Sequence, residues 1–75
     1  MDKISTIRDL VALWPSRQIF AQDLDVPVVR VHKWITANSI PAKYQKYVLD
    51  SASARALPVS APLILEIHAE TRSAA

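Results

Sequence analysis

Four side chains with complementary binding properties recur with helical spacing in the middle of the chain. Val29, His32, Lys33 and Thr36 stand at positions i, i+3, i+4 and i+7, which lie on one face of an α-helix. Histidine and lysine can donate hydrogen bonds, valine offers methyl groups, and threonine offers both kinds of contact. Because a β-strand would mix charged and apolar residues on both of its faces, this spacing predicts a helix with an exposed binding face.

The residues around this face set the bounds of the predicted helix. Pro27 suits the first turn of a helix, where its missing N–H loses no partner. Val31 and Trp34 share the opposite, apolar face, so Trp34 is expected in the core. Asn38 can adopt the left-handed backbone conformation that ends a helix. We therefore predict a helix from about Pro27 to Ala37.

Positive charge is concentrated in the same part of the sequence. The chain has 75 residues and a net charge of +2, whereas residues 26–55 carry five basic residues against one acidic residue. Residues 1–25 and 56–75 each carry one more acidic than basic residue. Such a local excess is typical of a surface that binds a polyanion, and a solvated basic face is the alternative.

Two helices are predicted before this segment. Apolar residues recur with helical spacing over residues 4–14, where Ser5 or Thr6 can serve as the cap and a proline ends the run. Residues 17–24, "RQIFAQDL", form a second helix, for which Ser16 is a suitable N-cap.

Two more helices are predicted after it. The first opens at Pro41 and extends over residues 41–52; its apolar stripe consists of Tyr44, Tyr47, Val48 and Ala52. Ser60 can cap a last, short helix over residues 62–71, and residues 72–75 are expected to fray.

Residues 17–36, "RQIFAQDLDVPVVRVHKWIT", match the helix-turn-helix plan of two short helices joined by a tight turn. The plan needs a small residue where the helices cross, and Ala21 stands in that place. The apolar residues expected at the crossing are Leu24, Val26, Val31 and Trp34. Asp25 occupies the turn position where glycine is usual, and aspartate tolerates the positive φ of that position better than most residues.

Together with the following "SIPAKYQKYV", this segment resembles the small phage Cro-type and lambda-repressor-like DNA-binding proteins. The shared layout is a tryptophan near the end of the second motif helix, an Ile-Pro pair and an aromatic residue; here these are Trp34, Ile40, Pro41 and Tyr44. The resemblance covers roughly residues 4 to 53. It implies a compact all-α domain of four to five helices. It also implies a homodimer that binds an operator in double-stranded DNA, an inverted repeat, and represses or activates transcription; a Cro-like repressor is the expected form.

The resemblance further implies which residues contact DNA. The second motif helix enters the major groove and would bring to the base edges Val28, Val29, His32, Lys33 and Thr36. Lysine and histidine could donate to guanine O6 and N7, and the valines could contact the thymine methyl group. Phosphate contacts are implied for Arg17, Gln18, Arg30, Lys43 and Lys46. The alternatives are that Val28 completes the core, that His32 is an ordinary surface histidine, and that Lys43 and Lys46 are only solvated.

Residues 1–55 are expected to form the DNA-binding domain and residues 56–75 a C-terminal extension. The extension is richer in apolar residues than a frayed tail needs, so its candidates for a dimer interface are Leu63, Ile64 and Ile67. Alternatively, these three residues fold back on the first helix of the same chain.

The composition argues against several classes of function. The chain has no cysteine, and His32 and His68 lie far apart with no second ligand at metal spacing, so neither a metal nor another cofactor is expected. Because there is no glycine for a phosphate-cradling loop and no nucleophile motif, no enzyme activity and no small-molecule ligand are expected. No apolar run approaches the roughly 20 residues of a membrane span, so a cytoplasmic protein is expected.

A second hypothesis is a protein-interaction or antitoxin-like module of the same shape. Val28 and Val29 are less polar than the residues often found in a DNA-reading helix, and they could instead bind a partner protein.

Overall fold

Five α-helices and their short connections make up the part of the chain that the computed structural model describes, residues 4–74, with side chains described to residue 69. The helices are α1 (Ile7–Val11), α2 (Arg17–Leu24), α3 (Val28–Ala37), α4 (Ala42–Ala54) and α5 (Ala61–Ala74). No strand occurs among these residues, and the Cα radius of gyration is 11.4 Å. The expected compact all-α fold of four to five helices is confirmed.

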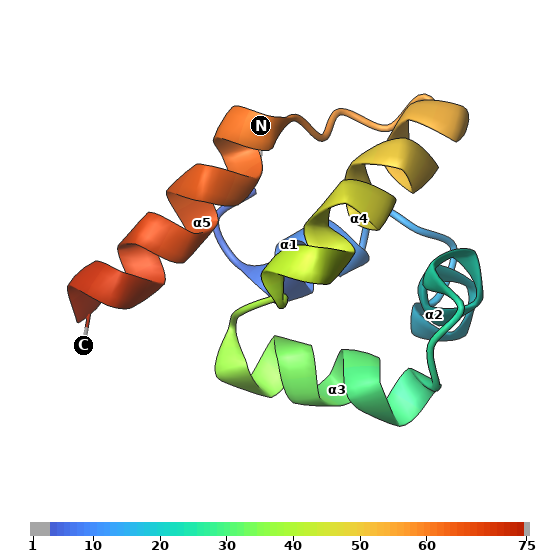
Figure 1. Cartoon of the computed structure of the whole chain (residues 1–75), viewed down its shortest axis with the longest axis horizontal. Helices are drawn as coiled ribbons and strands as arrows, with labels where there is room; N and C mark the ends of the chain where they lie inside the picture. Colours follow the sequence, from blue (N-terminus) through green and yellow to red (C-terminus); the bar gives the residue numbers. More distant parts are fainter. Residues whose placement is uncertain (1–3, 75) are drawn as a thin grey trace.

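The arrangement of the helices leaves one side of α3 open. The consecutive helices α2 and α3 pack against each other, α2 also packs on α4, and α1 packs on α3. Figure 1 shows α3 along one edge of the molecule, with α2 beyond one of its ends and α5 on the opposite side of the molecule from α2. The outer side of α3 therefore faces away from the other helices.

Local sequence signals set the ends of the first three helices. Thr6 caps α1 and Ser16 caps α2, and each side-chain oxygen accepts a backbone N–H hydrogen bond at 3.1 Å. Asp25, with φ 57°, ends α2, and Asn38, with φ 55°, ends α3; both are left-handed, as predicted. Pro27 is the residue directly before α3.

The first helix is shorter than predicted. It covers Ile7–Val11, whereas the apolar pattern predicted a helix over residues 4–14. After Val11 the backbone tightens, because the Leu13 and Trp14 N–H groups donate to carbonyls three residues back at 3.1 and 3.0 Å. The spacing of the apolar residues therefore continues through this tight turn to Trp14, although the α-helix itself ends at Val11.

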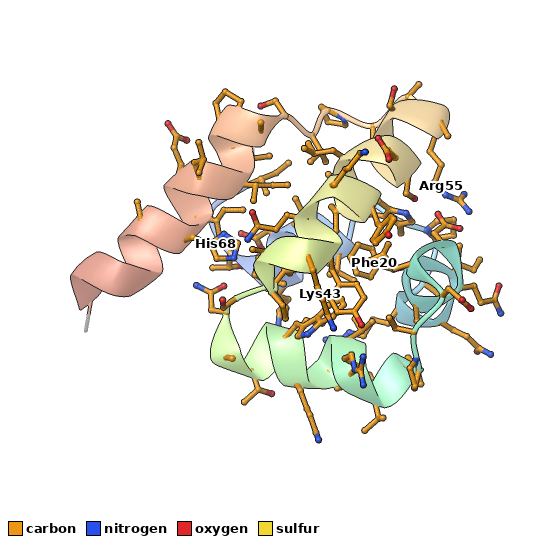
Figure 2. All side chains as sticks on the ribbon, in the orientation of Figure 1. Phe20, Lys43, Arg55 and His68 are labelled. Carbon is orange, nitrogen blue, oxygen red and sulfur yellow. The ribbon has the colours of Figure 1, made fainter. Side chains whose placement is uncertain are left out.

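The core lies where α1, α2, α3 and α4 meet. Phe20 is fully buried among the helices (Figure 2), and its ring forms a T-shaped pair with Trp14 at a centroid distance of 4.7 Å. Val31 and Trp34 of α3 are buried as well, which confirms the predicted division of this helix into an apolar inner face and a mixed outer face. The segment with four valines is therefore a helix, as its spacing predicted.

Tyr47 corrects the predicted apolar stripe of α4. The side chains of Val48 and Ala52 are fully buried and Tyr44 is half-buried, but Tyr47 is 53% exposed. Successive residues of an α-helix are turned by about 100°, so the neighbour of the central Val48 lies at the edge of the buried stripe. Tyr47 is therefore a surface residue beside Tyr44 rather than a core residue.

The last helix belongs to the same core as the other four. Ile64 and Ile67 are buried within the core of their own chain and Leu63 is half-buried, which corrects the expectation that the two isoleucines face a second copy. The boundary expected at residue 55 therefore does not separate two independently packed parts of the chain. The helix also continues to Ala74, where the sequence predicted fraying after residue 71, and Ala75 lies outside the described residues.

A histidine connects α5 to the turn before α4. The His68 Nδ1–H donates to the Ile64 carbonyl at 2.8 Å, and Nε2 accepts from the Ile40 backbone N–H at 3.0 Å. Figure 2 shows His68 directed from α5 toward the rest of the molecule. Ile40 is almost fully buried, so water cannot reach its backbone N–H. The imidazole of His68 supplies the acceptor that this N–H needs.

Replacing His68 with alanine is expected to lower the free energy of unfolding by about 1–3 kcal/mol, since the buried Ile40 N–H is left without an acceptor. Urea denaturation followed by circular dichroism measures the change. His32→Ala is the matched control, because it removes the other histidine from an exposed position and should change stability by less than about 0.5 kcal/mol. Equal losses in the two variants would contradict the structural role of His68.

Candidate nucleic-acid interface

The five side chains predicted to meet base edges are all exposed on one helix. Val29 is 57% exposed and Val28 is 37% exposed, and the three polar members of the set are exposed as well. The alternative that Val28 completes the core is therefore not what the structure shows. We call this set the α3 face; it consists of Val28, Val29, His32, Lys33 and Thr36.

The hydrogen-bond partners within the α3 face determine what it can offer a ligand. The Thr36 hydroxyl donates to the His32 carbonyl at 3.0 Å, so its oxygen lone pairs and its methyl group remain available. Lys33 presents only donors. The face thus combines donor groups, an acceptor and valine methyl groups, which is the mixture that base edges in the major groove complement.

Arg17 lies beside one part of the α3 face. It is the first residue of α2, and its guanidinium meets the His32 ring nitrogen Nδ1 at 3.0 Å. Gln18, its neighbour, is exposed. The N-terminal end of α2 therefore brings a positive charge to the edge of the α3 face.

A second basic group lies where α3 meets α4. The Arg30 guanidinium donates to the Tyr44 hydroxyl at 2.8 Å, and the Lys43 ammonium nitrogen lies 5.2 Å from the centroid of the Tyr44 ring. Tyr44 in turn contacts Trp34, with ring centroids 5.1 Å apart. These residues line a surface hollow together with Lys33 and residues of the α3–α4 connection. The aromatic ring thus holds two cations near the α3 face by hydrogen bonding and cation–π attraction.

The predicted phosphate contacts separate into two groups and one outlying residue. Arg17 and Gln18 lie at the start of α2, and Arg30 and Lys43 lie at the α3–α4 hollow. Lys46 is exposed on α4 and is not among the residues that line this hollow.

Tyr44 was expected as a core residue, and its polar role was missed because the partner arginine is fourteen residues away in the sequence.

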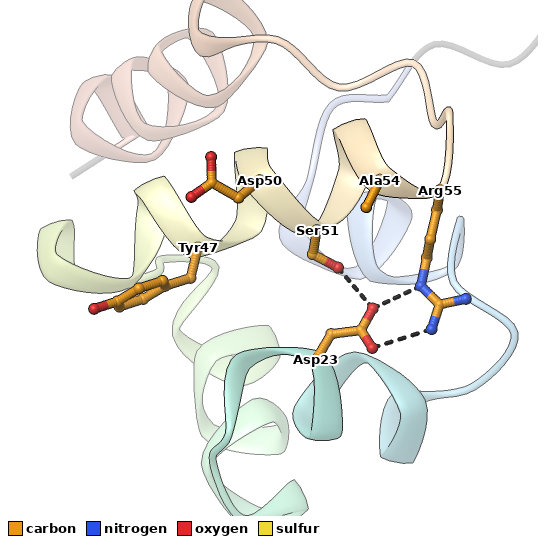
Figure 3. Close-up of a pocket in the computed structure, with 6 residues that line it drawn as sticks. All are labelled: Asp23, Tyr47, Asp50, Ser51, Ala54 and Arg55. Atoms are coloured by element: carbon orange, nitrogen blue, oxygen red, sulfur yellow. Dashed lines mark hydrogen bonds and ion pairs between the residues drawn. The ribbon is translucent and has the colours of Figure 1, made fainter.

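A hollow between α2 and α4 contains a network that sequence reasoning did not find (Figure 3). The Asp23 carboxylate accepts hydrogen bonds from Ser51 Oγ at 2.6 Å and from Arg55 Nε and a terminal nitrogen at 2.6 and 3.0 Å. The indole N–H of Trp14 also donates to Asp23, at 3.0 Å. In Figure 3, Tyr47 and Asp50 point away from this cluster. Because these polar groups are satisfied by one another, the network connects α2 to α4 rather than forming a ligand site.

The network changes the acidity of Asp23. The hydrogen bonds from Arg55 lower the pKa of the Asp23 carboxyl far below its ordinary value of 3.8; partial burial opposes this shift, and the Ser51 and Trp14 hydrogen bonds add to it. Asp23 in turn raises the pKa of the Arg55 guanidinium. Both directions mean that the charged pair is the stable form in the folded chain.

This network predicts a specific sensitivity to acid. Since the pKa of Asp23 is lower in the folded than in the unfolded chain, its stabilising contribution is complete above about pH 5 and declines progressively below about pH 4. Wild type should therefore lose more stability between neutral pH and about pH 3 than Asp23→Asn does, and urea unfolding at each pH measures this. Asp50→Asn, which lines the same hollow, should keep the wild-type pH profile. Identical profiles for wild type and Asp23→Asn would contradict the assigned role of the carboxylate.

Other kinds of site lack support in the described residues. Across the part of the chain that could be searched, no three histidine, cysteine, aspartate or glutamate side chains gather closely enough to hold a metal ion. Nor does any described helix combine the length and apolar character needed to cross a membrane.

No known protein family, curated protein or solved structure matches the chain. The functional inference therefore depends on the residues of the α3 face and on the basic groups beside it.

Proposed function

We propose that the chain is a sequence-specific regulator of transcription that binds double-stranded DNA, a Cro-like repressor that reads the major groove with α3. The observation that carries this proposal is the exposed α3 face with basic side chains on both of its flanks. A single α-helix fits into the major groove of B-DNA, where methyl groups, donors and acceptors distinguish the four base pairs.

The positions of the basic groups support this orientation. Arg17 lies at one flank of α3, and Arg30 and Lys43 lie toward the connection to α4. In a helix that occupies the groove, the flanking side chains meet the phosphates of the two strands, which set the register without reading sequence. The α3 face would then supply the base contacts.

A homodimer is part of the proposal. A helix as short as α3 contacts few base pairs, and two linked copies provide affinity and specificity together. Ile64 and Ile67 are occupied in the core, so the dimer contact must use other groups. Leu65 is a large exposed apolar residue among the described side chains of α5, at 67% exposure, and half-buried Leu63 lies two residues before it. Such a regulator would act in the cytoplasm, at the operator.

A second candidate function is a protein-interaction module, in the manner of an antitoxin. The observation in its favour is that Val29 and Tyr47 are large apolar or aromatic side chains that are more than half exposed. An apolar partner surface could cover them without any polyanion.

Salt dependence separates the two candidates. Binding of the purified chain to fluorescently labelled duplex DNA should weaken steeply with salt. The log–log slope should be about −3.6 for each bound protomer if the four basic candidates for phosphate contact, Arg17, Arg30, Lys43 and Lys46, each contribute about −0.9. Lys43→Gln should make the slope less steep by about one unit, whereas the core remains intact because Lys43 is exposed. Absence of DNA binding at low salt, or a slope near zero, would contradict the proposal and favour the interaction module.

A further inference from the structure

The contact between Arg17 and His32 determines which ring nitrogen of His32 carries the proton. The Arg17 guanidinium has only hydrogen-bond donors, so the His32 Nδ1 atom at 3.0 Å must act as the acceptor. In neutral imidazole one nitrogen is an acceptor and the other is a donor. The proton of His32 is therefore on Nε2.

The Nε2–H group of His32 is available to a ligand. His32 is exposed on the α3 face, and within the described residues Nε2 has no hydrogen-bond partner. Its backbone carbonyl is already occupied by the Thr36 hydroxyl. The ring therefore offers an outer partner a donor and no acceptor.

We propose that Arg17 is a specificity-determining residue, which positions His32 and holds it in the Nε2–H form so that His32 selects a hydrogen-bond acceptor on the base edge. The acceptors in the major groove are guanine N7 and O6, adenine N7 and thymine O4, whereas cytosine N4 and adenine N6 are donors that this histidine rejects. The base selection depends on the proposed function; the position of the proton does not.

Arg17 also connects two kinds of DNA contact. Its guanidinium has five N–H donors, and the contact with His32 uses one nitrogen, so further donors remain for a phosphate oxygen. A residue that only contacts phosphate should change affinity by the same factor for all sequences. Loss of Arg17 should instead change which base pair is preferred, as well as lower the affinity.

The two histidines of the chain allow an internal comparison. His68 donates from Nδ1 to a carbonyl and accepts at Nε2 from a backbone N–H, so its proton is on Nδ1. His32 has the opposite arrangement. The structure thus predicts two neutral histidines with opposite tautomers in one small protein.

Nitrogen-15 NMR of the imidazole rings, recorded at alkaline pH, tests without DNA which ring nitrogen of His32 carries the proton. Wild type should show His32 protonated at Nε2 and His68 protonated at Nδ1. Arg17→Ala should increase the Nδ1–H population of His32 and leave His68 unchanged, and Arg17→Lys, which retains a donor, should restore the wild-type signal. Protonation of His32 at Nδ1 in the wild type, or no response to Arg17→Ala, would overturn the assignment.

Selection of DNA from a random pool tests whether Arg17 influences the base preference of His32. Arg17→Ala should reduce the preference at one base pair of the half-site about tenfold, and Arg17→Lys should largely keep it. Lys46 is exposed on α4 and does not line the α3–α4 hollow, so Lys46→Ala should lower affinity and leave the base preference unchanged. An unchanged preference in Arg17→Ala would overturn the role of Arg17. If wild type enriches no sequence, the proposed function and the base selection fail together, and the NMR result alone then decides the tautomer.

Discussion

Replacing Val29 with glutamate is expected to weaken binding to duplex DNA about 100-fold while leaving the free energy of unfolding nearly unchanged. Val29 is the most exposed valine of the α3 face, so a polar side chain in its place disturbs no core contact. In the complex, however, the new carboxylate would stand in a groove lined by phosphates, where a juxtaposed like charge costs several kcal/mol. A loss of about 3 kcal/mol corresponds to about 100-fold in the dissociation constant.

Leu65→Glu introduces the same charge at the residue proposed for the dimer contact, so it separates loss of dimerisation from loss of a groove contact. Leu65 is also an exposed apolar residue, but it lies on α5, a helix separate from the outer side of α3 (Figure 1). Titrations monitored by fluorescence anisotropy, at one salt concentration and at low protein occupancy, would compare both variants with wild type. Similar affinity for Val29→Glu and wild type would show that α3 does not enter the groove. A weakened Leu65→Glu that also becomes monomeric would identify Leu65 with the dimer contact.

Replacing Phe20 with alanine is expected to lower the free energy of unfolding by about 3–5 kcal/mol. Phe20 is fully buried between the helices, and its ring packs nearly perpendicular to the indole of Trp14. Truncation removes both the buried aromatic surface and this contact and leaves a cavity that the short helices can fill only partly. For a domain with a total stability of roughly 5–15 kcal/mol, such a loss removes a large share of it.

Tyr47→Ala is the control for Phe20→Ala, because it also truncates an aromatic ring but at a half-exposed position. Urea denaturation should give a loss of less than about 1 kcal/mol for this variant. If Phe20→Ala does not fold, Phe20→Leu provides a measurable intermediate value. A loss in Phe20→Leu no greater than that in Tyr47→Ala would contradict the placement of Phe20 in the core.

The parts of the fold that local chemistry controls could be predicted from the sequence. Ser16 and Asn38 mark helix ends because a capping oxygen and a tolerance for the left-handed conformation are properties of a single residue and its near neighbours. The two faces of α3 followed from helical periodicity, because one side of that helix is buried and the other is open.

The parts that depend on distant residues could not be predicted in this way. Asp23 meets Ser51 and Arg55 only after α2 and α4 pack together, and no spacing in the sequence indicates that pairing. In the same way, Ile64 and Ile67 have a spacing that suits either a dimer surface or a core, and only the position of α5 decides between them.

The candidate site shows the same difference between features set by neighbouring residues and features set by distant ones. The α3 face was predictable because its residues belong to one helix, and all five are exposed in the structure. The partners that orient it were not, since Arg17 reaches His32 across fifteen residues and Tyr44 reaches Arg30 across fourteen. Periodicity identifies which side chains share a surface, whereas tertiary packing determines which of them interact.

The most direct test of DNA reading by the α3 face is selection from a random duplex pool with the purified chain, in parallel with a His32→Ala, Lys33→Ala double variant. Wild type is expected to enrich an inverted repeat with half-sites about one helical turn, roughly 10 base pairs, apart. The double variant is expected to lose the preference at the positions that these two residues contact. Enrichment of no sequence at low salt, or an identical motif in the double variant, would contradict the assignment of α3 as the reading helix.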